Sequence, residues 1–554
     1  MPDPPRSRPS IEVPDREGEI PGPELAGGHL DRRRFLQALA AVGAGGVLGT
    51  VLGPPRAARA AADPALIFPD GLKSGDPLPD GCVLWTRLAP PSDGRQSLPA
   101  LWMVAEDDAF TRVVAGGIVF VDARTGWTLK VRTRGLGADR WYHYRFFAEG
   151  AYSRAGRLRT APRPTATPDR LRYGFASCQQ RGIRGIDGRE SLYVTHRAIA
   201  EDGVDFLIHL GDYVYVSDTG TQSLADYRSV YHRFHSNPLL QDLQAAVPLV
   251  AAWDDGEFYN GVDRTGPPAR LANARRAWFD MMPVLNNAAD RTHRRFSWGR
   301  LADFLLLDTR QYRDPEVPPN AIYAGIEAQD NRFPPSDQMF APGRTTLGAA
   351  QEAWLKRELL LSRAAWRMLG SSYNVCPWKR IDYDTPELRA LDPTLVANAG
   401  LYVSNEAWDD YAVERRELLE WLLAQRIDNV VFNSGHTHFY LASELMPDYD
   451  DPASPVAAFD FVTGSQTADP DPRTLAGEGL LRLIEQVMLG ANEPYMKEVN
   501  MVDQGYVLVD LTPEECVVSF RLVDTFDPGA SARTGKRFRV RNGARTLEVL
   551  PPEA

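Results

Sequence analysis

The chain has 554 residues, of which 44% are apolar and 24% are charged, and its formal net charge is −11. This length and composition allow one to three globular domains with a large hydrophobic core. The negative charge argues against a protein that binds nucleic acid through general attraction to phosphate, although a local positive site can still bind an anionic substrate. We therefore expect no stable nucleic-acid partner.

Residues 1–62 have the features of a disordered N-terminal region followed by a signal peptide. Three arginines, residues 32–34, precede a mildly apolar run at residues 35–53, and the stretch "RAARAAADP" after it offers A-x-A cleavage sites. The order Arg-Arg-x-Phe-Leu resembles the twin-arginine export signal, with Asp31 and Gln37 where Ser and Lys are usual.

This signal predicts export by the twin-arginine translocase, to the periplasm, the cell surface or the medium. The alternative is an uncleaved N-terminal anchor. No later stretch has the ~18 consecutive apolar residues of a membrane helix, so we expect no permanent membrane span in the mature chain. Because twin-arginine cargo is generally exported in the folded state, often with a cofactor bound, the signal also favours a metalloprotein.

Residues 63–160 contain short runs of alternating apolar and polar residues, such as "GCVLWTRLA", "GGIVFVDA" and "WYHYRFFAEG", separated by turn residues. This pattern is typical of a small all-β sandwich of the fibronectin or immunoglobulin kind. Residues 161–169 are rich in Pro and Thr and are predicted to form a linker.

Residues 170–554 show a different pattern. "LRYGFASC", "VDFLIHLGD", "RLADFLLLDTR" and "IDNVVFNSGHTH" are near-continuous apolar runs, which indicate buried strands covered on both faces. "ESLYVTHRAIAE", "AAQEAWLKRELLLS" and "YAVERRELLEWLLAQ" have helical spacing. The alternation predicts a layered α/β domain, and "QGYVLVDLTPEECVVSFRLVD" adds antiparallel strands near the C-terminus.

Polar residues stand at the ends of four apolar runs, where ligands collect in α/β domains: "YGFASC", "FLIHLGDYVY", "LVAAWDDGEFYN" and "VVFNSGHTHF". Taken singly, Cys178 could be a core residue or half of a disulfide, and Asp212 could cap a turn. Four such endings together predict one shared site. Its candidate residues are Cys178, Asp212, Tyr215, Asp254, Asp255, Glu257, Asn260, His436 and His438.

The candidate residues mix sulfur, nitrogen and oxygen donors. A thiolate and a phenolate favour a trivalent or soft transition metal, whereas carboxylates and an amide oxygen suit a hard cation. Asp212 has two carboxylate oxygens and can bridge two ions. Two metals about 3.5–4 Å apart can stabilise the attacking and leaving oxygens of a displacement at phosphorus, so the set indicates phosphate-ester hydrolysis.

The motifs "SGDPLPDGCVLWTRL", "FASCQ", "HLGDYVY", "WDDGE", "LLDTRQYR" and "LGAAQEAWL" resemble the PhoD-type alkaline phosphatases, which belong to the calcineurin-like metallophosphoesterases. The resemblance covers residues 66–530. It implies an α/β fold with a four-layer core, two packed mixed sheets flanked by helices, after the small β-sandwich. It also implies an Fe(III) plus Ca(II) centre and hydrolysis of phosphomonoesters and often phosphodiesters.

The resemblance assigns roles to individual residues. Cys178, Asp212, Tyr215 and His438 would hold the iron, and Asp212 would bridge to a second ion. That second ion would be held by Asp255, Asn260 and His436. Family members more often have Asp than His at position 436, so zinc or iron is an alternative to calcium there.

One position departs from the family pattern W-D-D-H-E, because Gly256 stands where His is usual. Either water or another side chain protonates the leaving group, or the activity is specialised or lost. We favour the first interpretation.

The remaining roles concern catalysis and substrate. Asp212, Asp255 and Arg310 are predicted to be catalytic, and Tyr213, Asp254 and Arg313 are predicted to contact substrate. A guanidinium can bind phosphate through two hydrogen bonds, although Arg310 could instead pair with Asp308.

The sequence thus predicts an exported, metal-dependent phosphoesterase acting on a small-molecule, lipid or nucleotide phosphate ester. The alternatives are a phosphodiesterase or phospholipase D-like enzyme using the same site, and a non-catalytic phosphate-binding protein of the cell envelope with a degenerate site.

Overall fold

A computed structural model describes residues 63–180, 191–285, 291–317, 339–382, 385–393, 400–402, 406–451, 453–468 and 478–551. The predicted signal peptide lies outside these residues. Within them, no helix is both long enough and apolar enough to cross a bilayer.

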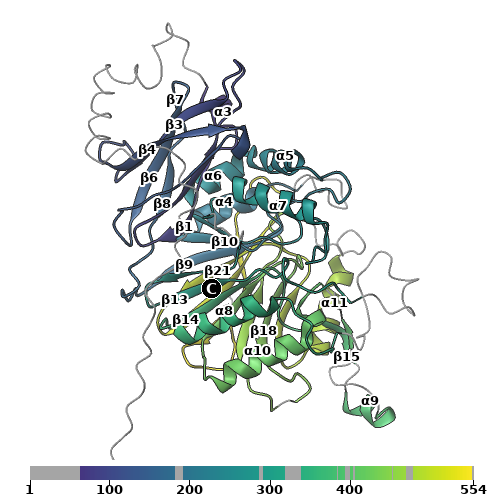
Figure 1. The fold of residues 1–554 in the computed structure, drawn as a ribbon. Coiled ribbons are helices and arrows are strands. Elements are labelled where there is room, and N and C mark those ends of the chain that lie inside the picture. Colours follow the sequence, from purple (N-terminus) through teal and green to yellow (C-terminus); the bar gives the residue numbers. More distant parts are fainter. Residues whose placement is uncertain are drawn as a thin grey trace, which may run out of the picture.

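The largest sheet has ten strands and runs through the middle of the molecule (Figure 1). Its central strands β9, β10, β11 and β1 pair in parallel, and the strands on both flanks pair antiparallel. In spatial order the strands are β24 (Glu548–Leu550), β23 (Arg533–Arg541), β22 (Glu515–Val523), β21 (Gln504–Leu511), β9 (Leu171–Ala176), β10 (Phe206–His209), β11 (Leu249–Ala251), β1 (Leu72–Leu78), β2 (Gly81–Arg87) and β5 (Thr128–Arg132).

A second sheet has seven strands, with β13, β14, β17 and β19 parallel and the others antiparallel. In spatial order these are β12 (Arg294–Trp298), β13 (Ala302–Leu306), β14 (Trp366–Ser371), β17 (Val430–Ser434), β19 (Ala458–Val462), β18 (Tyr440–Leu445) and β20 (Met496–Asn500). A two-stranded sheet, β15 (Lys379–Asp382) and β16 (Gly400–Tyr402), completes this part of the chain.

The two large sheets pack face to face through one apolar core. Phe175 and Ile208 from the ten-stranded sheet meet Phe304, Met368 and Val431 from the seven-stranded sheet, and all five are fully buried. Aliphatic and aromatic side chains both contribute to this core, so the sheets are held together mainly by buried apolar area. The predicted pair of packed mixed sheets is confirmed.

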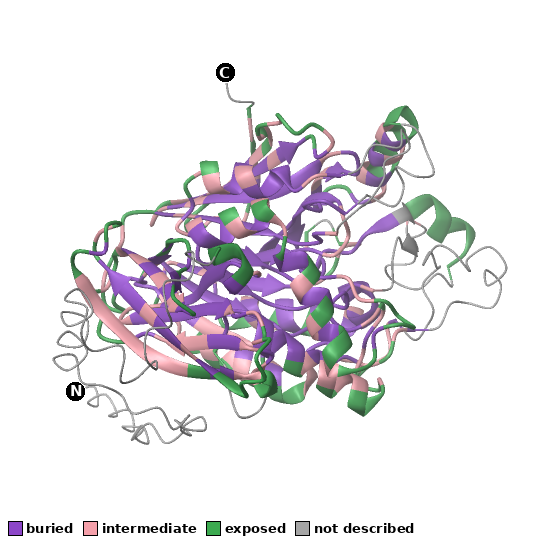
Figure 2. Ribbon diagram, turned by 90° about the horizontal axis from the view of Figure 1, so that it is seen from above, coloured by how far each residue is buried: buried purple, intermediate pink, exposed green. Residues whose placement is uncertain are grey.

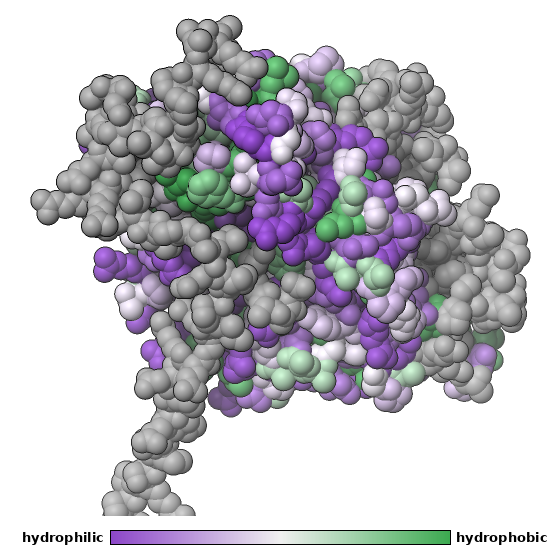
Figure 3. All heavy atoms as spheres, turned by 45° about the horizontal axis from the view of Figure 1, so that its top comes forward, coloured by the Kyte–Doolittle hydropathy of each residue, from purple (hydrophilic) through white to green (hydrophobic). Residues whose placement is uncertain are grey.

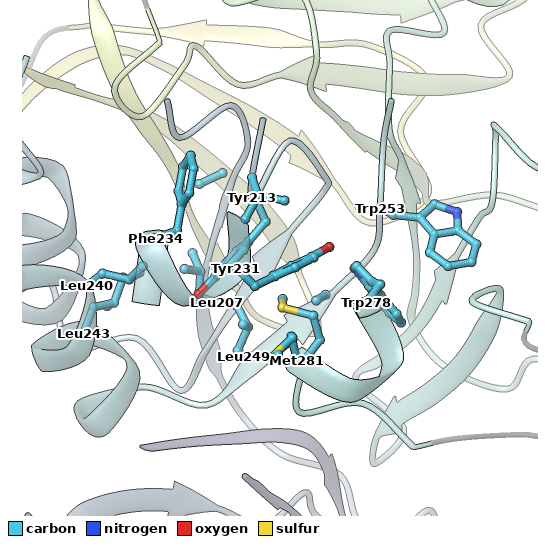
Figure 4. Close-up of a cluster of buried hydrophobic side chains, with 14 of the residues drawn as sticks. Leu207, Tyr213, Tyr231, Phe234, Leu240, Leu243, Leu249, Trp253, Trp278 and Met281 are labelled. Carbon is cyan, nitrogen blue, oxygen red and sulfur yellow. The ribbon is translucent and has the colours of Figure 1, made fainter. Parts of the chain in front are cut away.

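Helices cover the outer face of each sheet. The ten-stranded sheet packs against α4 (Val194–Glu201), α5 (Leu224–His235), α6 (Pro238–Ala246) and α7 (Pro268–Met281) through a core that includes Leu207, Leu249 and Trp278 (Figure 4). The seven-stranded sheet packs against α8 (Gly348–Leu361), α10 (Ala412–Ala424) and α11 (Glu478–Ala491). These layers confirm the predicted four-layer α/β core, and α4, α8 and α10 coincide with the three predicted helices.

The N-terminal region differs from the expected separate sandwich. β1 pairs in parallel with β11 at Gly75 and Leu249, and β2 and β5 follow it, so three N-terminal strands belong to the ten-stranded sheet. The rest of the region forms a five-stranded sheet of β4 (Val113–Asp122), β3 (Ser97–Ala105), β6 (Trp141–Ala148), β7 (Ala151–Tyr152) and β8 (Gly156–Arg159).

A shared core explains this arrangement. Leu72, Leu84 and Leu129 from the large sheet pack on Leu98 and Phe146 from the five-stranded sheet. The five-stranded sheet therefore packs on one end of the ten-stranded sheet. The facing side chains of the two sheets bury each other in one core. Figure 2 shows the resulting distribution, with buried strands inside and exposed residues concentrated on helices and loops.

Candidate metal centre

Four strand ends meet at one edge of the packed sheets. β9, β10 and β11 are parallel neighbours, so the loops after them, which carry Cys178, Asp212 and Asp254, leave the sheet on the same side. His436 and His438 follow β17 of the second sheet. A single β-bridge between Ser177 and Ser465 joins the loop after β9 to the loop after β19. The predicted convergence of strand ends is therefore the geometry of the molecule.

Four of these residues adopt left-handed backbone conformations. φ is 60° at Cys178, 54° at Asp212, 70° at His436 and 61° at His438. None is a glycine, and each such residue costs on the order of 1–3 kcal/mol. The strain is concentrated where the chain turns its ligand-capable side chains toward a common centre.

One cluster combines sulfur, phenol, imidazole and carboxylate. The Cys178 thiol lies 3.4 Å and the Tyr215 hydroxyl 3.0 Å from Asp212 Oδ2, and the Tyr215 hydroxyl is 3.1 Å from His438 Nε2. Donor atoms of Cys178, Asp212 and His438 all lie within 4.8 Å of one another. This is the spacing of a set that can close around one ion.

A second cluster contains three carboxylates and an imidazole. Donor atoms of Asp212, Asp254, Asp255 and His436 lie within 4.8 Å of one another. His436 Nδ1 is 2.7 Å from Asp254 Oδ2, 3.8 Å from Asp255 Oδ1 and 3.9 Å from Asp212 Oδ2. Asp212 belongs to both clusters, so its carboxylate lies between two potential cation sites.

The electrostatics of both clusters match the requirements of bound cations. Burial, and then the Asp254 and Asp255 carboxylates, raise the pKa of Asp212 well above its ordinary value. Burial, reinforced by Asp212, does the same to the pKa of the Cys178 thiol and of the Tyr215 phenol. Without a cation these groups resist ionisation, and a cation among them would stabilise their anionic forms.

The same carboxylates favour the charged form of the His436 imidazole. Burial alone would lower its pKa, but the Asp254 carboxylate, followed by Glu406 and Asp255, raises its pKa well above the ordinary value. The imidazole therefore takes the place of a missing positive charge among the carboxylates. A bound cation would compete with that proton for the same oxygens.

Arg310 lies fully buried beside the second cluster. Its Nε donates to Asp254, and its Nη2 is 3.8 Å from Asp255 Oδ2. Asp308 accepts the backbone N–H of Arg310 but does not contact its guanidinium, so the predicted alternative pairing is absent. Its Nη1 is buried without a hydrogen-bond partner among the described residues, and it can donate to a bound oxyanion.

Three predicted site residues, Tyr213, Arg313 and Asn260, lie outside the two clusters. Tyr213 is buried in the helix-side core of Figure 4, where its hydroxyl meets Gln244. Arg313 donates to the Val262 carbonyl and, at 2.7 Å, to Glu316.

Asn260 is exposed, and its amide donates to Asp218 over 3.3 Å, so the structure does not bring it into the second cluster. Gly261, the next residue, donates its backbone N–H to Asp255 Oδ2 at 2.9 Å. The loop thus passes beside Asp255 with its backbone, while the predicted amide ligand faces outward.

Glu406 is a site residue that the sequence patterns did not indicate. Its Oε2 is 3.1 Å from His436 Nε2, which lowers the pKa of Glu406 despite its burial. Glu316 lies beside it, and burial followed by the Glu406 charge raises the pKa of Glu316 to about 7. Glu316 lies well beyond the end of β13, and Glu406 follows the three-residue strand β16, which no apolar run indicates, so the rule that identified the other candidates could not identify them.

Glu257 holds two of the site loops together. Its buried carboxylate accepts backbone N–H groups from Asp212 at 3.0 Å, Tyr213 at 2.7 Å and Asp254 at 2.8 Å. Three donors on one buried carboxylate form a rigid connection. Glu257 thereby fixes the Asp212 loop relative to the Asp254 loop.

Gly256 leaves no room for a side chain. Its N–H donates to Asp212 Oδ1 at 2.9 Å, and a Cβ at this position would lie 2.6 Å from Asp212 Oδ1 and 2.7 Å from the Val214 carbonyl oxygen. The residue that departs from the family pattern is therefore packed directly against the shared carboxylate.

All four cysteines are buried and free, so Cys178 is not in a disulfide. Its sulfur also lies 3.0 Å from the hydroxyl of Ser177.

Comparisons with known proteins match most of the chain. A family model described as PhoD-like phosphatase matches residues 173–520, and one described as PhoD-like phosphatase, N-terminal domain, matches residues 55–162. Alkaline phosphatase D of Bacillus subtilis (strain 168) is 30% identical over 553 residues, which cover 92% of this chain and 87% of that protein. A solved structure described as Structure of PhoD aligns with a TM-score of 0.75 at 29% identity, covering 90% of this chain and 94% of the other.

Replacing Gly256 by Ala should displace the Asp212 carboxylate, because the new Cβ would meet it at 2.6 Å. We expect phosphatase activity and bound metal to fall together, activity by more than about 10-fold, since outer contacts of metal ligands are typically worth 10–100-fold. Gly490→Ala is the matched control, because a Cβ there meets nothing within 4 Å. Full activity and metal content in Gly256→Ala would contradict the packing described.

Proposed function

Given that the chain belongs to the PhoD-like phosphatase family and hydrolyses phosphoric esters, we propose that it does so with two cations that share the Asp212 carboxylate. The observation that carries the proposal is that Asp212 belongs to both donor clusters. When bound, such a metal pair supplies an activated water and neutralises charge on the phosphoryl group.

The first cluster is proposed to hold Fe(III). Cys178 and Tyr215 supply a thiolate and a phenolate, His438 an imidazole, and Asp212 a carboxylate. Two anionic ligands of this kind favour a trivalent transition metal over a purely oxygen-seeking cation. The raised pKa values of both groups support this assignment, because only a strong cation offsets the cost of ionising them in a buried site.

The second cluster is proposed to hold the second ion through Asp212, Asp255 and His436, with Asp254 in place of Asn260 as a further ligand. Asp254 Oδ2 is buried and lies 2.7 Å from His436 Nδ1, in a position where a cation could replace the imidazole proton. Three carboxylates suit Ca(II), whereas the imidazole suits zinc or iron. Elemental analysis distinguishes these choices.

The chain's own residues then orient the substrate. Arg310 is proposed to bind a phosphoryl oxygen through Nη1, while Asp254 holds the other side of the guanidinium. Asp212 and Asp255 keep the reacting centre anionic enough to retain both cations. Because Gly256 contributes no side chain, protonation of the leaving group is assigned to water or to another side chain at the site.

The non-catalytic alternative is set aside, because the matching family model and the 30% identical relative are both phosphatases. The preference between mono- and diesters depends on how many phosphoryl oxygens the arginines of the site bind. Arg310 is the one guanidinium proposed at the phosphoryl group, so a second ester group replaces an oxygen that no arginine of the proposal binds. We therefore propose that both classes are hydrolysed.

Export is proposed to follow the twin-arginine pathway, with the translocase as a transient partner and the periplasm, cell surface or medium as the destination. The arginines at residues 32–34 and the apolar run after them support this. A buried metal centre that closes only when four loops and two sheets have come together also suits export of a folded protein.

Replacing Cys178 by Ala should remove one iron ligand, and Asp212→Asn should weaken both sites. We expect iron content to fall in both variants and activity to fall by more than about 100-fold, the upper range for disturbing a metal's supporting shell. Metal content is measured by elemental analysis of purified protein. Cys516→Ala is the matched control, because Cys516 is also buried and free but lies in the core between the sheets. Iron and activity unchanged in Cys178→Ala would refute the iron site.

Replacing Arg310 by Lys should lower kcat/KM by about 10–100-fold, because a lysine cannot reproduce both the Asp254 contact and a second donor toward phosphate. Arg313→Lys is the control, since Arg313 binds Glu316 and a backbone carbonyl. We expect Arg313→Lys to lower the melting temperature with little change in KM. A larger rise in KM in Arg313→Lys than in Arg310→Lys would contradict the assignment.

Turnover of nitrophenyl phosphate and bis-nitrophenyl phosphate by the same preparation tests the substrate class. We expect both esters to be hydrolysed, and both activities to disappear in Asp212→Asn. If diester turnover alone is found, or if it survives in Asp212→Asn, the proposed common site is wrong.

A further inference from the structure

Ser177 is a buried residue that lies between the two donor clusters without belonging to either of them. It follows β9 directly, and its exposed fraction is 1%. Its hydroxyl oxygen is 3.0 Å from the Cys178 sulfur of the first cluster. The same oxygen accepts the backbone N–H of His436, in the second cluster, at 3.4 Å. One hydroxyl group therefore touches residues of both clusters.

Two features of the backbone bring these groups together. In a regular strand, neighbouring side chains point to opposite faces, but Cys178 has a φ of 60°. This conformation ends the alternation after β9 and allows the sulfur to meet the preceding hydroxyl. On the other side, a Cβ at Gly435 would lie 2.6 Å from Ser177 Oγ. Any larger residue at position 435 would push the His436 loop away from the hydroxyl.

The direction of the hydrogen bond between Ser177 and Cys178 follows from the protons that are available. A serine hydroxyl carries one proton and two lone pairs. The His436 N–H occupies one lone pair, so the proton remains free. A cysteine that binds a metal does so as a thiolate, which carries no proton and can only accept. With a cation bound, the hydroxyl of Ser177 is therefore the donor and the Cys178 sulfur is the acceptor.

The other groups around the sulfur cannot take this role once a cation is bound. Asp212 Oδ2 is 3.4 Å from the sulfur, but an ionised carboxylate only accepts hydrogen bonds. Tyr215 would lose its proton as a phenolate ligand. Solvent does not reach the sulfur either: hydrophilic side chains predominate on the face shown in Figure 3, whereas Cys178 has no exposed surface. Ser177, which is not a proposed ligand, keeps its proton.

We propose that Ser177 is a positioning residue of the iron site, and that its hydroxyl donates a hydrogen bond to the Cys178 thiolate and thereby raises the reduction potential of the bound iron. The inference rests on the proposed Fe(III) site. A hydrogen bond to a coordinating sulfur withdraws electron density from it, and proteins adjust the potentials of metal–thiolate centres in this way. Less negative charge on the sulfur stabilises the ferric state less, so the potential is higher.

The backbone of Ser177 is held firmly enough for this role. Ser177 forms the parallel β-bridge to Ser465, and its carbonyl accepts the Gln466 N–H at 3.1 Å. Because these contacts fix the residue in place, its hydroxyl holds the neighbouring sulfur in one position. Ser177 thus acts on the cation through Cys178, without contacting the cation itself.

A redox titration of the iron-loaded, full-length protein, followed through its visible charge-transfer absorption, tests the proposal. Ser177→Ala removes the donor, and we expect a lower midpoint potential than in the wild type, with iron still bound. Ser372→Ala is the matched control, because Ser372 is equally buried and its hydroxyl donates to the Trp253 carbonyl at 2.7 Å. It should leave the potential unchanged even if its melting temperature falls.

An unchanged or higher potential in Ser177→Ala overturns the proposal. An equal decrease in Ser372→Ala also overturns it, because loss of any buried hydroxyl near the site would then suffice. If Ser177→Ala does not fold, the wild type decides: its iron–sulfur stretching band in the resonance Raman spectrum should shift between protein prepared in ordinary and in heavy water. A band that does not shift excludes the hydrogen bond.

The outcome also separates this inference from the proposed function. A wild type that contains no iron overturns the proposed iron site, and the role of Ser177 with it. An iron-loaded wild type whose potential is the same as that of Ser177→Ala overturns the role of Ser177 alone.

Discussion

The carboxylate of Asp212 is the group on which the arrangement of the site depends. One of its oxygens accepts the Gly256 N–H at 2.9 Å, and the other lies near the Cys178 thiol and the Tyr215 hydroxyl. The Glu257 carboxylate fixes the backbone on which it stands. Because Asp212 is shared between two clusters, a small displacement of this one loop would change both sites at once.

The fold accounts for how so many strained and charged groups can be held there. Four residues in left-handed conformations cost on the order of 1–3 kcal/mol each, and the buried carboxylates add to that cost. The opposing contribution comes from the apolar core between the two sheets and from the cores under the helices outside them. The four residues stand just after the ends of buried strands, which limits how far each can move on its own.

The sequence pattern predicted the parts of this arrangement that depend on strand order. Buried parallel strands end at one edge, so Cys178, Asp212 and Asp255 were expected together. His436 and His438, after β17, were expected there for the same reason. The pattern does not specify where each side chain points. Tyr213 is adjacent to Asp212 but turns into the helix-side core, and Asn260 faces solvent. Glu406 follows β16, a three-residue strand that no apolar run in the sequence indicates.

The N-terminal region shows the same limit of sequence-based prediction, here for the pairing of strands. Alternating residues predicted strands correctly, but the pairing of β1 with β11 depends on a partner more than 170 positions away in the chain. Periodicity within β1 carries no information about that partner. The consequence is structural continuity between the N-terminal strands and the sheet that carries Cys178 and Asp212.

A crystal structure of the exported protein, with anomalous scattering data collected on both sides of the iron edge, tests the central claim most directly. The account predicts two metal peaks about 3.5–4 Å apart, with Asp212 bound to both and Cys178, Tyr215 and His438 around the iron. A single peak, or two peaks of which only one contacts Asp212, would contradict it.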